Sequence, residues 1–122
     1  MKTLKAVIVI AIVLMINSAT EAQGYNYKLD GPFTATRTFK VSGVCEMCRH
    51  RIESTVQILP GFWSSAWDVN SQTLMVKYDK TKVSPDKIEQ RIAAVGHDTE
   101  KFKASDETYT ILPDCCHYRG KS

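Results

Sequence analysis

The chain has 122 residues, of which 43% are hydrophobic and 24% charged, and its formal net charge is +3. This is the composition of a globular protein, and the length leaves room for one domain with a modest core, which excludes a large multidomain enzyme. The small positive charge is interspersed with acidic residues and leaves no footprint for nucleic-acid binding.

Residues 1–22 have the three-part layout of a secretory signal peptide. Two lysines precede an apolar run over residues 6–16, and a short polar stretch ends at Ala22. This run of eleven residues is too short for a membrane-spanning helix, which needs about 20. We therefore predict cleavage after Ala22, or alternatively after Ala19, and a periplasmic or secreted mature protein; an uncleaved anchor is the competing interpretation.

After a leader at residues 23–33, period-two alternation predicts a strand over residues 34–41. A helix is predicted over residues 45–59, and a Pro-Gly pair ends it. Its apolar positions recur at spacings of four, four and three, as one face of a helix requires: Cys48, Ile52, Val56 and Leu59.

Two further strands are predicted at residues 62–69 and 73–78, joined by a short polar turn. A serine N-cap followed by proline then opens an amphipathic helix over residues 85–95. Residues 99–104 are predicted to form a short final strand. The domain therefore spans residues 34–104, and residues 105–122 form a polar tail.

The four cysteines fall in two tight pairs, Cys45 with Cys48 and Cys115 with Cys116. The first pair lies at the start of the first predicted helix, where the helix N-terminus favours thiolates and where Arg49, His50 and Arg51 add positive charge. Two thiolates three residues apart can both bind one ion. Soft sulfur ligands select Cu(I) and also suit Zn(II), Cd(II) and Hg(II), whereas a structural zinc site needs about four ligands.

The order of elements and several short motifs resemble the heavy-metal-associated (HMA) domain family over residues 34–104. The motifs that carry the resemblance are Val41-Ser42-Gly43, Cys45-Glu46-Met47-Cys48, Leu59-Pro60-Gly61-Phe62, Trp67-Asp68-Val69, Val76-Lys77-Tyr78-Asp79 and Ile92-Ala93-Ala94-Val95-Gly96-His97-Asp98. The chain departs from the family pattern at Gly43, where a methionine is usual, and at His97, where an aromatic residue is frequent; some similar bacterial copper chaperones carry histidine there.

The resemblance implies an α+β, ferredoxin-like βαββαβ fold, in which two helices cover one face of a four-stranded antiparallel sheet. It also implies an exported bacterial metal carrier, similar to copper chaperones and periplasmic mercury carriers, that binds an ion through Cys45 and Cys48. Cu(I) is the first choice of metal. The expected partner is a metal-transporting membrane protein or efflux component, and the expected state is a monomer, with a metal-bridged dimer as the alternative.

The tail carries a second dense set of soft ligands, Cys115, Cys116 and His117. Adjacent cysteines pair with each other only under strain. We therefore expect the tail to fold over the Cys45/Cys48 loop and to add ligands, with His97 as a further candidate ligand. The alternatives are a second ion, or a disulfide that staples the tail to the first pair.

Two other functions compete with a copper carrier. A mercury(II) scavenger of the same fold would use the same two thiolates, which suit linear coordination. A thiol–disulfide oxidoreductase would also use a Cys-x-x-Cys motif, but no tryptophan precedes Cys45 and the element order is not that of a thioredoxin core. A purely structural disulfide domain is a further alternative. No hydrolytic constellation stands out, so we expect no enzymatic activity.

Overall fold

The computed structural model describes residues 31–121. The predicted signal peptide and residues 23–30 of the leader lie outside the described residues and stay predictions. Within residues 31–121, no helix combines the length and the apolar character that crossing a bilayer requires.

Three strands of the described part form an antiparallel sheet with β3 in the middle, in the order β1-β3-β2. They are β1 (Thr34–Lys40), β2 (Phe62–Asp68) and β3 (Thr73–Asp79). The register aligns Phe39 of β1 and Trp67 of β2 with Leu74 of β3. All three side chains are buried, so this row forms part of the core beneath the helices.

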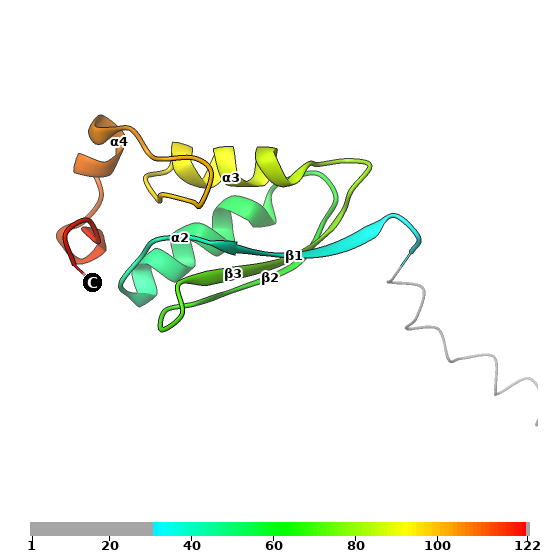
Figure 1. Cartoon of the computed structure of the whole chain (residues 1–122), viewed down its shortest axis with the longest axis horizontal. Coiled ribbons are helices and arrows are strands. Elements are labelled where there is room, and N and C mark those ends of the chain that lie inside the picture. The colour runs from blue at the N-terminus through cyan, green and yellow to red at the C-terminus, as the bar shows by residue number, and fades with distance from the viewer. Residues whose placement is uncertain (1–30, 122) are drawn as a thin grey trace, which may run out of the picture. The chain divides into compact units, whose positions relative to one another are not determined.

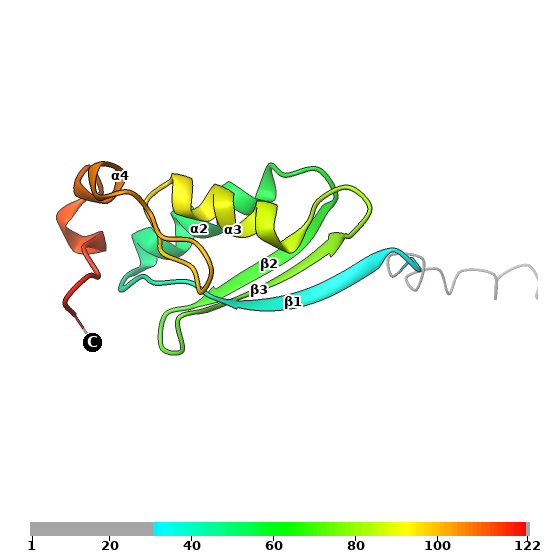
Figure 2. The same ribbon diagram turned by 45° about the horizontal axis from the view of Figure 1, so that its top comes forward.

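Two helices, α2 (Glu46–Gln57) and α3 (Pro85–Ala94), lie over the same face of this sheet (Figure 1). Figure 2 shows the same two-layer arrangement from a second direction. Each helix buries one stripe, as its apolar spacing predicts. The buried apolar residues of the two helices are Cys48, Ile52, Val56, Ile88, Ile92 and Ala93.

The predicted fourth strand over residues 99–104 is absent from the described sheet. A single bridge pairs Val41 with Thr99. The Thr99 amide donates to the Phe102 carbonyl at 2.7 Å, and the Ala104 amide donates to the Asp98 carboxylate at 2.8 Å. Because these amides bond within the segment, it closes on itself as a loop instead of extending along β1.

The tail is folded rather than irregular. It contains α4 (Asp106–Thr110) and the 3-10 turn η3 (Asp114–Cys116). Leu112, Cys116 and Tyr118 are buried and belong to the same core as the sheet and the helices. The tail therefore extends the domain core beyond the sheet and the two long helices.

Gly96 lies in close contact with Leu112 of the tail. Its φ is +109°, and a Cβ there would lie 2.8 Å from a Leu112 methyl carbon. We expect Gly96→Ala to destabilise the fold by about 3 kcal/mol, the sum of backbone strain and overpacking. Urea denaturation measures this. Gly120→Ala is the matched control, because Gly120 also has positive φ but nothing within 4 Å. Equal losses in the two variants would contradict the assigned contact.

Candidate metal centre

Cys45 and Cys48 lie at the N-terminus of α2, where the chain turns from the loop after β1 into the helix. Cys45 is the N-cap, with an extended backbone and no side-chain cap hydrogen bond. Cys48 lies in the first turn and is fully buried against the core. Their sulfur atoms are 3.1 Å apart. The unpaired amides and the dipole of the helix start stabilise negative charge on these sulfurs.

The tail places Cys116 and Cys115 beside this pair. The Cys116 sulfur lies 3.4 Å from the Cys45 sulfur, and the Cys115 sulfur lies 3.9 Å from that of Cys116. Cys115 also lies 3.3 Å from the Met47 thioether. All four cysteines are free thiols, so the described structure contains neither a staple between the pairs nor a disulfide within one. It brings the two cysteine pairs of the sequence to one place.

One set of three soft ligands meets the geometry of an ion site within the described residues. It consists of Cys45, Cys115 and Cys116, whose sulfur atoms all lie within 4.8 Å of one another. Cys48 adjoins it through Cys45. Sulfur-only ligands fit a thiophilic ion such as Cu(I) or Hg(II) and suit Mg²⁺ or Ca²⁺ poorly.

The two candidate histidines lie outside this sulfur set. His97 is fully buried; its Nδ1 is 2.9 Å from the Ser42 carbonyl oxygen and its Nε2 is 3.5 Å from an Arg51 guanidinium nitrogen. Because both ring nitrogens have protein partners, the geometry favours a positioning role for His97. The His117 ring packs on Tyr109 with centroids 5.0 Å apart, and its buried Nε2 finds no hydrogen-bond partner in the described structure.

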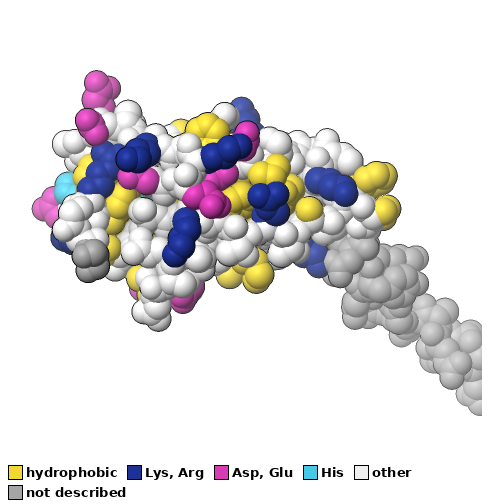
Figure 3. All heavy atoms as spheres, in the orientation of Figure 1, with side chains coloured by type: hydrophobic (Ala, Val, Ile, Leu, Met, Phe, Trp, Pro, Cys, Tyr) yellow, Lys and Arg dark blue, Asp and Glu magenta, His cyan; other side chains and the backbone are white. Residues whose placement is uncertain are grey.

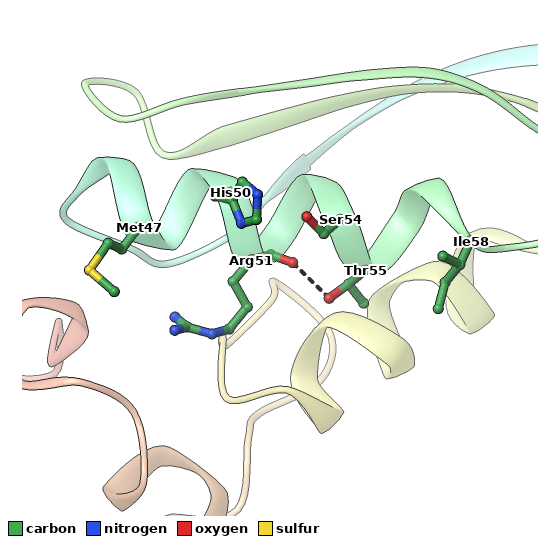
Figure 4. A pocket seen from close by; sticks show the side chains of 6 residues that line it. All are labelled: Met47, His50, Arg51, Ser54, Thr55 and Ile58. Atoms are coloured by element: carbon green, nitrogen blue, oxygen red, sulfur yellow. Dashed lines mark hydrogen bonds between the residues drawn. The ribbon is translucent and has the colours of Figure 1, made fainter.

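Arg51 is the residue whose role the sequence did not single out. Its guanidinium donates to the Cys116 sulfur at 3.2 Å, whereas neighbouring Arg49 pairs with Glu46 at 2.5 Å. Figure 4 shows Arg51 and Met47 on the side of α2 that faces the C-terminal segment. The available signal was its spacing, three residues after Cys48, which puts it one turn further along the helix.

The thiols differ in how readily they ionise. Burial opposes ionisation of Cys45, but hydrogen bonds from the Cys48 thiol and amide and from the tail thiols outweigh it and lower its pKa from 9.0 to about 7. Burial raises the pKa of Cys48 to about 12. Burial and the neighbouring sulfurs also raise the pKa of Cys115. Cys45 is therefore the sulfur that is ready to capture an ion near neutral pH.

We expect alkylation of the metal-free protein to begin at Cys45. Its rate should rise with pH through a midpoint near 7, because the thiolate is the nucleophile. Cys48 should react last, since it is buried and its pKa is about 12. Peptide mass spectrometry after pulses of iodoacetamide at a series of pH values measures the order. The denatured chain, in which all four thiols should react alike, is the control; the same order there would contradict the assignment.

The far end of the tail is tied to the loop after α3. The Tyr118 hydroxyl donates to the Gly96 carbonyl and accepts from the Asp98 amide, both at 2.8 Å. The Arg119 guanidinium makes a two-point contact with the Asp98 carboxylate at 2.9 and 3.2 Å, and it lies 4.3 Å from the centroid of the Tyr109 ring. These contacts hold the segment that carries Cys115 and Cys116.

Known proteins share the fold of this chain. A family model described as the heavy-metal-associated domain matches residues 38–98. A solved "putative copper-ion-binding protein" from Bacillus anthracis is 28% identical, covers 55% of this chain and 96% of its own, with TM-score 0.52. The structure titled "CopZ metallochaperone" is 24% identical over 53% of this chain and 98% of its own, with TM-score 0.52. No curated protein sequence matches the chain.

An N-terminal domain of a potential copper-translocating P-type ATPase from Bacillus subtilis, solved in the Cu(I)-loaded state, is also similar. It is 21% identical, covers 54% of this chain and 84% of its own, and has a TM-score of 0.52. At this identity the likeness establishes the fold alone. The three structures each cover little more than half of this chain.

Proposed function

The chain belongs to the heavy-metal-associated domain family, whose model matches half of it, and from that premise we propose that it is an exported carrier of Cu(I). The ion is held by the thiolates of Cys45 and Cys48 and is passed to a metal-transporting membrane protein or efflux component. The observation that carries the proposal is the sulfur pair at the start of α2, with atoms 3.1 Å apart and one thiol ionising at a pKa of about 7.

The geometry suits delivery as well as binding. Cu(I) accepts low coordination numbers, so two thiolates can hold it while an incoming thiolate of an acceptor displaces one of them. Cys45 is partly exposed and Cys48 is buried. An acceptor would therefore exchange first with Cys45, while Cys48 keeps the ion at the surface of the core.

Binding and transfer of Cu(I) test the proposal. Reduced protein under anaerobic conditions is titrated with Cu(I) against a coloured chelator, and the loaded protein is then mixed with an acceptor domain that carries its own Cys-x-x-Cys pair. We expect one tightly bound ion per chain and transfer of that ion to the acceptor domain. A chain that leaves all Cu(I) with the chelator would overturn the proposal.

The competing functions correspond to other results in the same assay. Preference for Hg(II) over Cu(I) in competition would assign the mercury scavenger instead. Metal-independent turnover of a disulfide substrate would assign the thiol–disulfide oxidoreductase. Export has its own readout, because cleavage after Ala22 gives a mature protein whose N-terminal residue is Gln23.

A further inference from the structure

The tail cysteines lie where a further ligand of the carried ion would have to lie. We propose that, with the tail closed, Cys115 and Cys116 join Cys45 in a three-sulfur site in place of Cys48. The tail then caps the bound ion, and the ion returns to the Cys45/Cys48 pair when the tail opens for transfer. This inference rests on the proposed function and adds the means by which release is controlled.

The sulfur atoms of the tail cysteines lie close to that of Cys45. Cys45 is shared, since its sulfur lies 3.1 Å from that of Cys48 and 3.4 Å from that of Cys116. The trio of Cys45, Cys115 and Cys116 lies within the span that one ion can bridge. Residues 45 and 116 are far apart in the sequence, so only folding of the tail brings them together.

A positive charge, that of Arg51, lies beside the sulfur trio. A ring of thiolates around a monovalent ion has net negative charge, which is costly away from water unless a cation lies beside it. The Arg51 guanidinium donates to the Cys116 sulfur at 3.2 Å and also lies 3.5 Å from His97 Nε2. His97 in turn lies against the Ser42 carbonyl through Nδ1. This arrangement fits the neutral tautomer with a proton on Nδ1, leaving Nε2 to accept from Arg51.

Buried side chains and hydrogen bonds anchor the tail segment that carries Cys116. Cys116 is fully buried, and its neighbours Leu112 and Tyr118 are buried on either side of it. Two hydrogen bonds of the Tyr118 hydroxyl fix this segment to the loop after α3. A sulfur held in this way is pre-organised, so it adds to affinity without the entropy cost of ordering a free tail.

Cys115 occupies the outer edge of the trio. It is exposed and lies 3.3 Å from the exposed thioether of Met47. With the tail closed, an acceptor thiolate can reach the ion from this edge, and its displacement of Cys115 begins the opening of the tail. Exchange with Cys45 follows once the tail is open. The capped site then retains Cu(I) until such an acceptor arrives.

Copper-edge X-ray absorption of the Cu(I)-loaded protein, with chelator competition and transfer kinetics, tests the cap. Four free thiols per chain are first verified in the reduced protein. We expect three sulfur neighbours in the wild type and two in Cys115→Ser/Cys116→Ser, with affinity lowered at least about tenfold and faster transfer to the acceptor. Ile111→Ser, an exposed change in the same segment, is the matched control and should behave as the wild type.

The outcomes separate this inference from the proposed function. Two sulfur neighbours in the wild type, with unchanged affinity in the double variant, overturn the cap and leave the carrier intact. Failure of the wild type to bind Cu(I) overturns the carrier itself. The wild-type coordination number requires no substitution, so the inference remains testable even if the double variant does not fold.

Discussion

Cys45→Ser is expected to weaken Cu(I) binding more than any other single substitution. The Cys45 sulfur lies 3.1 Å from that of Cys48 and 3.4 Å from that of Cys116. Its thiol also has the lowered pKa, about 7, so the variant loses the ligand that is ionised at neutral pH. We expect an affinity loss of at least about a hundredfold, beyond what the loss of a supporting residue costs a metal site.

The control for this variant is His50→Ala. His50 is an exposed residue of the same helix, and within the described residues its ring forms no hydrogen bond with the sulfur cluster. It should bind Cu(I) as the wild type does. Chelator competition measures both affinities, and far-UV circular dichroism verifies that both variants keep the fold. A Cys45→Ser protein with wild-type affinity would place the ion elsewhere in the chain.

Charged side chains of both signs lie close together on one face of the described part of the molecule. On the face drawn in Figure 3, dark-blue Lys and Arg side chains are interspersed with magenta Asp and Glu side chains. The depression on α2 is lined by Met47, His50, Arg51, Ser54, Thr55 and Ile58. Arg51, which lines this depression, is a cation that contacts the sulfur cluster, through Cys116.

The regular part of the fold was predictable because burial imposes a period on the sequence. The helix predicted over residues 45–59 is α2 (Glu46–Gln57), and that predicted over residues 85–95 is α3 (Pro85–Ala94). The alternation in residues 73–78 likewise identified β3. These elements bury one face against a partner, so their apolar spacing alone determines their type.

The prediction of a fourth strand rested on a weak pattern, and the described sheet lacks this strand for a local reason. Asp98 and Thr99 offer side-chain oxygens that accept backbone amides, and residues with such side chains compete with strand pairing. The loop that results places Asp98 where Arg119 can reach it. The pattern of residues 99–104 gives no indication of that long-range contact between Asp98 and Arg119.

One part of the candidate site was also predictable from the sequence, and another part was not. The spacing of Cys45 and Cys48 at a helix start was enough to single out the first pair. The approach of Cys115 and Cys116 was expected from their ligand chemistry, and the structure places them there; their role as ligands stays a prediction. The spacing of Arg51 from Cys48 puts it one turn further along α2, but its contact with Cys116 depends on the folded tail. The anchors Tyr118 and Arg119 carried no signal in the sequence.

Arg119→Ala is expected to release the tail from the domain. The guanidinium contacts the Asp98 and Asp106 carboxylates, the Ala104 carbonyl and the Tyr109 ring. Removing it leaves the Asp98 carboxylate, 17% exposed, without its cation. We expect a loss of about 2 kcal/mol, less than for a fully buried pair because Arg119 keeps 28% of its side chain exposed. Urea denaturation measures the loss, and hydrogen exchange should quicken over residues 105–121.

The ion pair between Arg119 and Asp98 predicts how acid changes the stability that the tail contacts contribute. Burial opposes ionisation of Asp98, but the Arg119 guanidinium and the Ala104 amide outweigh it and hold the pKa of the carboxyl below its ordinary value of 3.8. The ionised carboxylate therefore contributes its full stability above that value, and the contribution disappears as the pH falls through the lowered pKa. The stability gap between wild type and Arg119→Ala should be constant near neutral pH and close in acid. Lys101→Ala, which breaks an exposed pair with Asp86, should cost little at any pH; a gap that persists in strong acid would show that Arg119 stabilises the tail by packing rather than through Asp98.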